Sequence, residues 1–114
     1  MTTTSLDPPS DLVTLDVSGL PDDTCLTAAG EIDSSSAPVF RERLDALLAG
    51  GATGITIDLT RVTFLDSAGL CVLAAAHRRA EADGVTMRVL ASSRAVVRPL
   101  QITGLWALLR VEKV

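Results

Sequence analysis

The sequence predicts a single α/β domain built on a mixed, mostly parallel sheet of five strands, in the order β-β-α-β-α-β-α-β. Apolar and polar residues alternate with a period of two in several short segments, and apolar residues recur three and four positions apart between them. The chain has 114 residues, 47% of them hydrophobic, which suits one core but not two. Because crossovers between parallel strands are right-handed, this alternation predicts a sheet that is parallel after an opening hairpin.

The first two strands are predicted to form that hairpin. Residues 13–17 alternate as a half-buried strand does, residues 19–23 have the composition of a turn, and residues 24–29 form the second strand. A helix is expected after the serines at 34–36, and two glycines end it at residue 50. Its apolar positions, at helical spacing, are Phe40, Leu44, Leu47 and Leu48.

The second half of the chain repeats the alternation of strands and helices. The expected elements are a strand at 55–59, a loop carrying residues 64–66, a helix from Ser67 to the glycine at 84, a strand at 85–89, a helix capped by Ser92 or Ser93, and a strand at 108–111. The helix from Ser67 is apolar all round in its first half and charged in its second half. That pattern is typical of a helix that begins in the core and ends at the surface.

Composition and charge exclude several classes of protein. The formal net charge is -4 and no basic run is present, so neither direct contact with nucleic acid nor contact with a membrane is expected. Residues 1–10 lack the features of a signal peptide, and no segment approaches the ~18 apolar residues of a membrane helix. We therefore expect a cytoplasmic protein with a flexible N-terminal tail at 1–10, which is polar and contains Pro8-Pro9, and one domain at 11–114.

The cysteines and two of the aromatic residues indicate packing. Cys25 and Cys71 lie far apart and match no metal-ligand spacing, so each is expected to be a small buried hydrophobe. Phe64 and Trp106 are likewise expected to pack. Because no Gly-x-x-x-x-Gly-Lys loop is present, no cradle for a nucleotide is predicted. The sequence therefore predicts neither a metal site nor a cofactor.

The segment Val62–Leu70, VTFLDSAGL, runs a short apolar stretch into a hydroxyl at the start of a helix. Backbone N–H groups there have no partner within the helix, and the helix dipole is positive, so an anion on Ser67 is favoured. Asp66 and Ser67 are also common N-caps, and simple capping is the alternative interpretation.

Catalytic chemistry finds little support in the sequence. A serine nucleophile needs a base within hydrogen-bond reach, whereas the one histidine, His77, lies ten residues along the helix from Ser67, or ~15 Å. Asp58 lies near the end of a predicted strand, which could suggest a phospho-aspartate receiver. That class of protein also needs a lysine after its last strand, whereas the only lysine here is the penultimate residue. Asp33 and Asp66 could meet at the sheet edge, yet two carboxylates without a pocket are weak evidence for acid/base work. We expect no enzyme and no catalytic residue.

Three motifs resemble, in the same order, the landmarks of the STAS domain (sulfate transporter and anti-sigma factor antagonist). They are Gly30-Glu31-Ile32-Asp33, the positions Val62, Phe64, Asp66, Ser67, Gly69 and Leu70, and Val97-Arg98-Pro99-Leu100 followed by Gly104-Leu105. Together they cover roughly residues 12 to 112. The resemblance implies a STAS-like fold in which the strands lie in roughly sequential order.

The resemblance also implies a function in transcription regulation and stress response. It is that of a stand-alone anti-sigma factor antagonist (anti-anti-sigma factor), a phosphoprotein that binds an anti-sigma factor and so frees a sigma factor. Ser67 corresponds to the phosphorylated serine of the family, and Asp33 and Asp66 correspond to acidic residues beside it. With Ala68 and Gly69, these residues form the implied partner-binding site. Ala68 stands where many members carry a second small hydroxyl residue.

The implied partners are an anti-sigma factor that is itself a serine kinase, which would supply ATP and magnesium, and a phosphoserine phosphatase. Two alternatives stay open. The chain could be a scaffold or regulatory subunit of a larger complex, such as a stress-signalling assembly or a transporter, without a phosphorylation switch. It could also be a sensor for a nucleotide or lipid, although no pocket-forming feature of the sequence favours that function.

Overall fold

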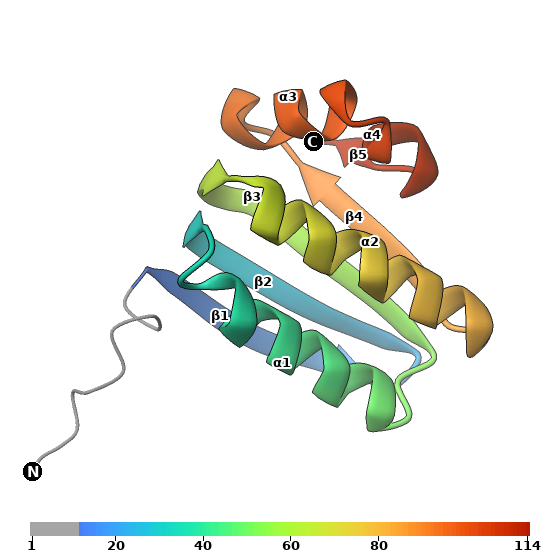
Figure 1. Ribbon diagram of the computed structural model, residues 1–114. Coiled ribbons are helices and arrows are strands. Elements are labelled where there is room, and N and C mark those ends of the chain that lie inside the picture. The colour runs from blue at the N-terminus through green and yellow to red at the C-terminus, as the bar shows by residue number, and fades with distance from the viewer. Residues whose placement is uncertain (1–11) are drawn as a thin grey trace, which may run out of the picture.

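The computed structural model describes residues 12–114 and contains one five-stranded sheet in the order β1-β2-β3-β4-β5 (Figure 1). The strands are β1 (Val13–Leu20), β2 (Asp23–Ile32), β3 (Gly54–Leu65), β4 (Thr86–Ala91) and β5 (Glu112–Lys113). The helices are α1 (Ala37–Ala49), α2 (Ser67–Ala82), α3 (Arg94–Ile102) and α4 (Leu105–Leu108). The predicted tail at 1–10 and the first residue of the predicted domain, Asp11, lie outside the described residues.

The arrangement of the strands confirms the predicted fold class. β1 and β2 form the expected antiparallel hairpin, and β2, β3, β4 and β5 run parallel. Parallel neighbours need a crossover, and α1 and α2 supply the first two. These two helices lie side by side across one face of the sheet (Figure 1).

The two faces of the sheet differ because side chains alternate along each strand. The face toward α1 and α2 carries fully buried apolar residues, among them Leu26, Ile57, Leu59 and Val89, which pack with Phe40, Leu44 and Leu73 of the helices. The opposite face carries polar residues such as Asp16, Thr27, Asp58 and Arg88, and each of them keeps contact with solvent. No helix within residues 12–114 covers that polar face.

β3 is longer than predicted, and this places the loop toward α2 differently. The sequence predicts a strand at 55–59 followed by a loop, whereas the strand continues to Leu65. Its second half pairs with β2 as far as the partners Ile32 and Leu65. On its other edge, the hydroxyl of Ser93 donates a hydrogen bond to the carbonyl oxygen of Val62 at 3.2 Å. Backbone pairing with β2, together with this side-chain contact, therefore keeps the segment extended.

The predicted strand at 108–111 is wrong. The chain instead forms the short helix α4, and the pairing with β4 begins only at Glu112. Leu105 and Leu109 lie one helical turn apart, and the backbone N–H of Leu109 donates to the carbonyl oxygen of Leu105 at 2.8 Å. This turn places Leu109 in the core, where it is 2% exposed.

Candidate functional site

The start of α2 is held by Asp66, which adopts an extended conformation and caps the helix. Its Oδ1 accepts the backbone N–H of Ala68 at 2.9 Å, and its carbonyl oxygen accepts the backbone N–H of Leu70 at 3.1 Å. Capping at this position is therefore real, and Asp66 performs it. Ser67, the first residue of the helix, is exposed, and its hydroxyl forms no hydrogen bond with any residue in 12–114. The hydroxyl is free for chemistry.

Asp33 organises the turn that leads into α1. Its Oδ1 accepts the hydroxyl of Ser35 at 2.7 Å, the backbone N–H of Ser35 at 2.9 Å and that of Ser36 at 3.2 Å. The Ser35 hydroxyl and these backbone donors hold the pKa of Asp33 below its ordinary value of 3.8. The carboxylate is therefore ionised at neutral pH. A general acid or base working near neutrality needs the opposite shift, so this arrangement suits a fixed negative charge.

The sheet brings Asp33 and Asp66 to neighbouring strand ends. Ile32 and Leu65 are partners in the parallel pairing of β2 with β3, and each aspartate directly follows one of them. The backbone N–H of Asp66 also donates to the carbonyl oxygen of Ile32 at 3.2 Å. Both carboxylates thus stand at the carboxyl edge of the sheet, close in the backbone to Ser67, and each is hydrogen-bonded within its own turn.

Two glycines of the recognised motifs are explained by close approach. A Cβ on Gly69 would lie 2.5 Å from a methyl carbon of Leu65 and 2.8 Å from one of Ile32, so glycine lets the first turn of α2 sit against the strand ends. Gly30 has φ +106°, and a Cβ there would collide with the carbonyl oxygen of Leu12. Gly69 is buried, and it contributes to the site by allowing the start of α2 to pack closely against the strand ends.

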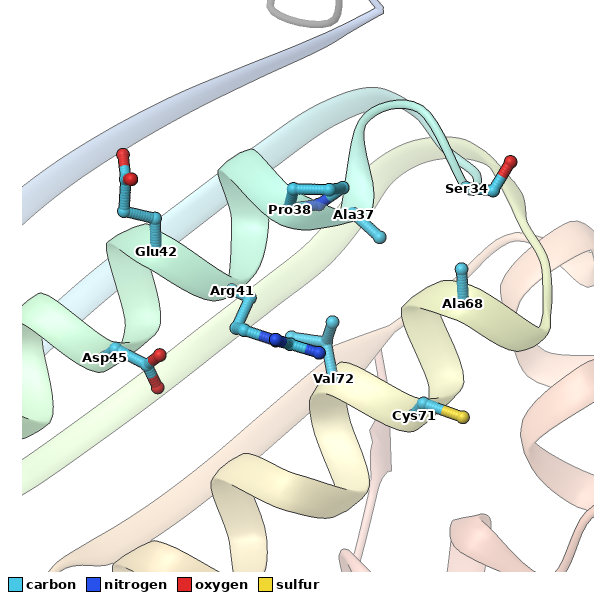
Figure 2. Close-up of a pocket in the computed structure, with 9 residues that line it drawn as sticks. All are labelled: Ser34, Ala37, Pro38, Arg41, Glu42, Asp45, Ala68, Cys71 and Val72. Atoms are coloured by element: carbon cyan, nitrogen blue, oxygen red, sulfur yellow. The ribbon is translucent and has the colours of Figure 1, made fainter.

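A groove of about 500 Å³ lies between the N-terminal halves of α1 and α2, beside this site (Figure 2). Its lining residues are Ser34, Ala37, Pro38, Arg41, Glu42, Asp45, Ala68, Cys71 and Val72. Arg41 reaches from α1 toward Val72 (Figure 2) and forms no ion pair with other described residues, whereas Asp45 pairs with Arg79 at 3.7 Å. The sequence contains no signal for this groove, because only the packing of two helices creates it.

The expectation that both cysteines are buried is wrong for Cys71, which is exposed, while Cys25 is half-buried. Cys71 follows Ser67 by four residues, so the two share one face of α2. The four-residue spacing could have predicted that Cys71 is exposed beside Ser67. The apolar residues around Cys71 in the first half of α2 favoured burial instead. The expected packing role of Phe64 is also wrong, since its side chain is 45% exposed beside the site. Trp106 packs against the core as predicted.

His77 lies far from Ser67 along α2, as the sequence predicts. α2 is continuous from Ser67 to Ala82, so His77 lies ten residues along it, ~15 Å from the serine. His77 instead lies 3.6 Å from Glu81 one turn later. Within residues 12–114, no group of three or more histidine, cysteine, aspartate or glutamate side chains is placed to hold a metal ion. No helix in that range is long and apolar enough to cross a membrane.

Comparison with known proteins identifies the family. The model of the STAS domain matches residues 14–113, and the chain belongs to this family. It is similar to the anti-sigma-B factor antagonist of Bacillus subtilis, with 36% identity over 93 residues, which covers 82% of this chain and 84% of that protein. It is also similar to the anti-sigma-F factor antagonist RsfB of Mycobacterium tuberculosis, with 35% identity over 80 residues, 70% of this chain and 65% of that protein.

The fold has counterparts among solved structures. The crystal structure of an anti-sigma factor antagonist from Mycobacterium paratuberculosis superposes with a TM-score of 0.82 and 31% identity, covering 89% of this chain and 86% of that one. Family and fold therefore agree with the resemblance found in the sequence.

Proposed function

We propose that this protein is an anti-sigma factor antagonist that binds an anti-sigma factor through the surface around Ser67 and so releases a sigma factor, and that phosphorylation of Ser67 ends this binding. One observation carries the proposal. In this STAS domain, the exposed hydroxyl of Ser67 forms no hydrogen bond with another described residue. It lies at the start of α2, near Asp66 and Asp33. The names of the similar proteins from B. subtilis and M. tuberculosis support the same role.

We also propose two protein partners and a cytoplasmic location. The anti-sigma factor is itself a serine kinase that supplies ATP and magnesium, and a phosphoserine phosphatase reverses the modification. The chain acts in the cytoplasm as ligand and phosphorylation substrate, not as an enzyme. Asp33, Asp66, Ser67, Ala68 and Gly69 form the partner-binding site, in which Gly69 acts by letting the helix start approach the sheet.

The switch follows from charge. A phosphoserine adds about -1.5 to -2 charges at neutral pH, next to the carboxylate of Asp66 and near that of Asp33, whose lowered pKa keeps it ionised. A partner surface shaped for a hydroxyl would then have to accommodate a dianion within an already acidic site. Repulsion and desolvation of about 4 kcal/mol correspond to roughly a thousandfold loss of affinity. Binding is lost while the fold is kept.

The neighbouring serines are poor alternatives for phosphorylation. The hydroxyl of Ser35 is bonded to Asp33, and Ser36 is fully buried with its hydroxyl donating to the carbonyl oxygen of Glu31 at 2.8 Å. Modification of either would break the turn that precedes α1. Ser34 is exposed and is the residue whose modification the experiment must separate from that of Ser67.

The test is a pull-down from native lysate followed by reconstitution. The co-purifying kinase, incubated with the protein and ATP, should add one phosphate by intact mass, and Ser67→Ala should gain none. Ser34→Ala is the matched control and should be modified like the wild type. A phosphate on residues 34–36, or a chain that elutes within a large particle and is never phosphorylated, would contradict the proposal. The second outcome would favour the scaffold function.

A further inference from the structure

A second hollow, of about 390 Å³, lies beside β5, and none of the residues assigned to the Ser67 site lines it. It is formed by Ser92, Arg94, Val97, Arg98, Gln101 and Lys113. Ser92 follows the end of β4 and Lys113 ends β5, so the hollow lies at the carboxyl ends of two neighbouring parallel strands. We propose that the hollow binds the phosphate group of an anionic ligand.

The charges of the hollow are unfavourable as they stand. Arg94 and Arg98 lie one turn apart on α3, a spacing at which like charges repel. Arg94 is also the first residue of the helix, where the dipole is positive, and the first turn contains no acidic residue. Lys113 adds a third positive charge from β5. Three cations thus line one hollow in a protein of net charge -4, and a bound anion would reduce the repulsion between them.

No acidic side chain lines the hollow beside these cations. None of the three cations takes part in an ion pair within residues 12–114. The acid next in sequence, Glu112, is already engaged, because Arg88 donates from Nη2 to Oε1 at 3.0 Å and from Nε to Oε2 at 3.1 Å. Alternation along β5 turns Glu112 and Lys113 to opposite sides. The hollow therefore keeps its positive charge.

The donors in the hollow suit phosphate better than a single carboxylate. Guanidinium groups bind phosphate oxygens with two parallel hydrogen bonds, and a dianion balances more of the three charges than a monoanion does. The hydroxyl of Ser92 already donates to the carbonyl oxygen of Thr60 at 3.3 Å, so the charged side chains and the amide of Gln101 are the available donors. No aromatic side chain lines the hollow, so recognition rests on the phosphate group itself. The site does not depend on the proposed function of Ser67.

The test titrates pyrophosphate into isotope-labelled protein and follows the backbone amide chemical shifts. We expect saturable shifts at residues 92–98 and at 113, and none around residue 67. The variant Arg94→Gln/Arg98→Gln should weaken binding by at least about tenfold. The matched control Arg43→Gln/Arg78→Gln changes the net charge equally at two exposed arginines outside the hollow and should bind like the wild type.

A second arm identifies the source of the phosphate. Vesicles of phosphatidylcholine with and without phosphatidic acid are sedimented with the wild type and with both double variants. Binding to phosphatidic acid vesicles that only Arg94→Gln/Arg98→Gln abolishes would assign the site to a lipid headgroup, and binding to pyrophosphate alone would assign it to a soluble ligand. Equal weakening in both double variants, shifts centred on residue 67, or no saturation by either probe up to about 10 mM would overturn the proposal.

Discussion

The carboxylate of Asp66 accepts the backbone N–H of Ala68 at 2.9 Å, and it thereby fixes the first turn of α2 without using the hydroxyl of Ser67. Serine is itself a common N-cap, but Ser67 stands one residue later, as the first residue of the helix. Because Asp66 provides the cap, phosphorylation of Ser67 would leave the cap of the helix in place. The predictions for Ser67 follow from this separation.

The first prediction concerns binding of the partner. Ser67→Ala removes only a free hydroxyl and should keep the affinity of the unmodified protein. Ser67→Glu places a charge beside Asp66 and should weaken binding by at least tenfold, or about 1.4 kcal/mol, as measured by calorimetry with the purified anti-sigma factor. Ser18→Glu adds the same charge at an exposed position on β1 and should bind normally. Equal affinities for all three variants would exclude the electrostatic switch.

The second prediction concerns the stability of the phosphorylated form. A phosphate at the start of α2 gains ~0.3 to 1 kcal/mol from the helix dipole, and repulsion from Asp66 opposes it with a similar magnitude. Both forms should therefore melt within about 4 °C of each other, with superimposable far-UV circular dichroism. A fall of more than ~10 °C, or a loss of helical signal, would show that partner release is an unfolding event instead.

The third prediction concerns Gly69. Alanine normally stabilises a helix by up to about 1 kcal/mol relative to glycine, but here its methyl group would meet Leu65 and Ile32. Gly69→Ala should therefore lower the free energy of unfolding by about 1 to 3 kcal/mol, as measured by urea denaturation. Ala75→Gly, at an exposed position of the same helix, calibrates the intrinsic preference. A stabilised Gly69→Ala would contradict the packing described for the site.

The fourth prediction concerns pH. Because the folded pKa of Asp33 is lowered, the carboxylate stabilises the fold above its unfolded pKa, near 3.8, and this contribution is lost as the pH falls through the folded value. Asp33→Asn should therefore have a lower melting temperature than the wild type at pH 6. This difference in melting temperature should become smaller as the pH is lowered toward about 2.5. Asp16→Asn, on an exposed part of β1, should show no comparable difference. A difference in melting temperature that does not change with pH would mean that ionisation of Asp33 does not stabilise the fold.

Local patterns were enough to predict most elements and the position of Ser67. The hairpin, α1 and the start of α2 each carry an alternation, a cap or a glycine within a few residues, and such signals act over short range. The C-terminal segment was predicted wrongly, because Leu105, Leu109 and Val111 fit either a strand or a turn of helix. Leu109 and Val111 are both buried, a pattern that a strand would also give, so the local sequence does not distinguish the two conformations.

The surroundings of Ser67 were harder to predict than Ser67 itself. Whether Cys71 is covered depends on how far α1 reaches over α2, and the exposure of Phe64 depends on β3 extending beyond β4. The hollow at Arg94, Arg98 and Lys113 lies between α3 and β5, and the sequence predicted the last strand at residues 108–111 instead of 112–113. Each of these features depends on two elements meeting, for which a single segment contains no signal.

The polar face of the sheet gives the molecule a side that can be altered without disturbing either proposed site. Asp16 and Thr27 are partners on that face, and Asp16 is exposed on the edge strand β1. Because the helices pack on the opposite face, a fluorophore attached at residue 16 through an unnatural amino acid would leave the core intact, and both Cys25 and Cys71 could stay unchanged. Such a probe would make the assembly and dissociation of the complex visible in real time.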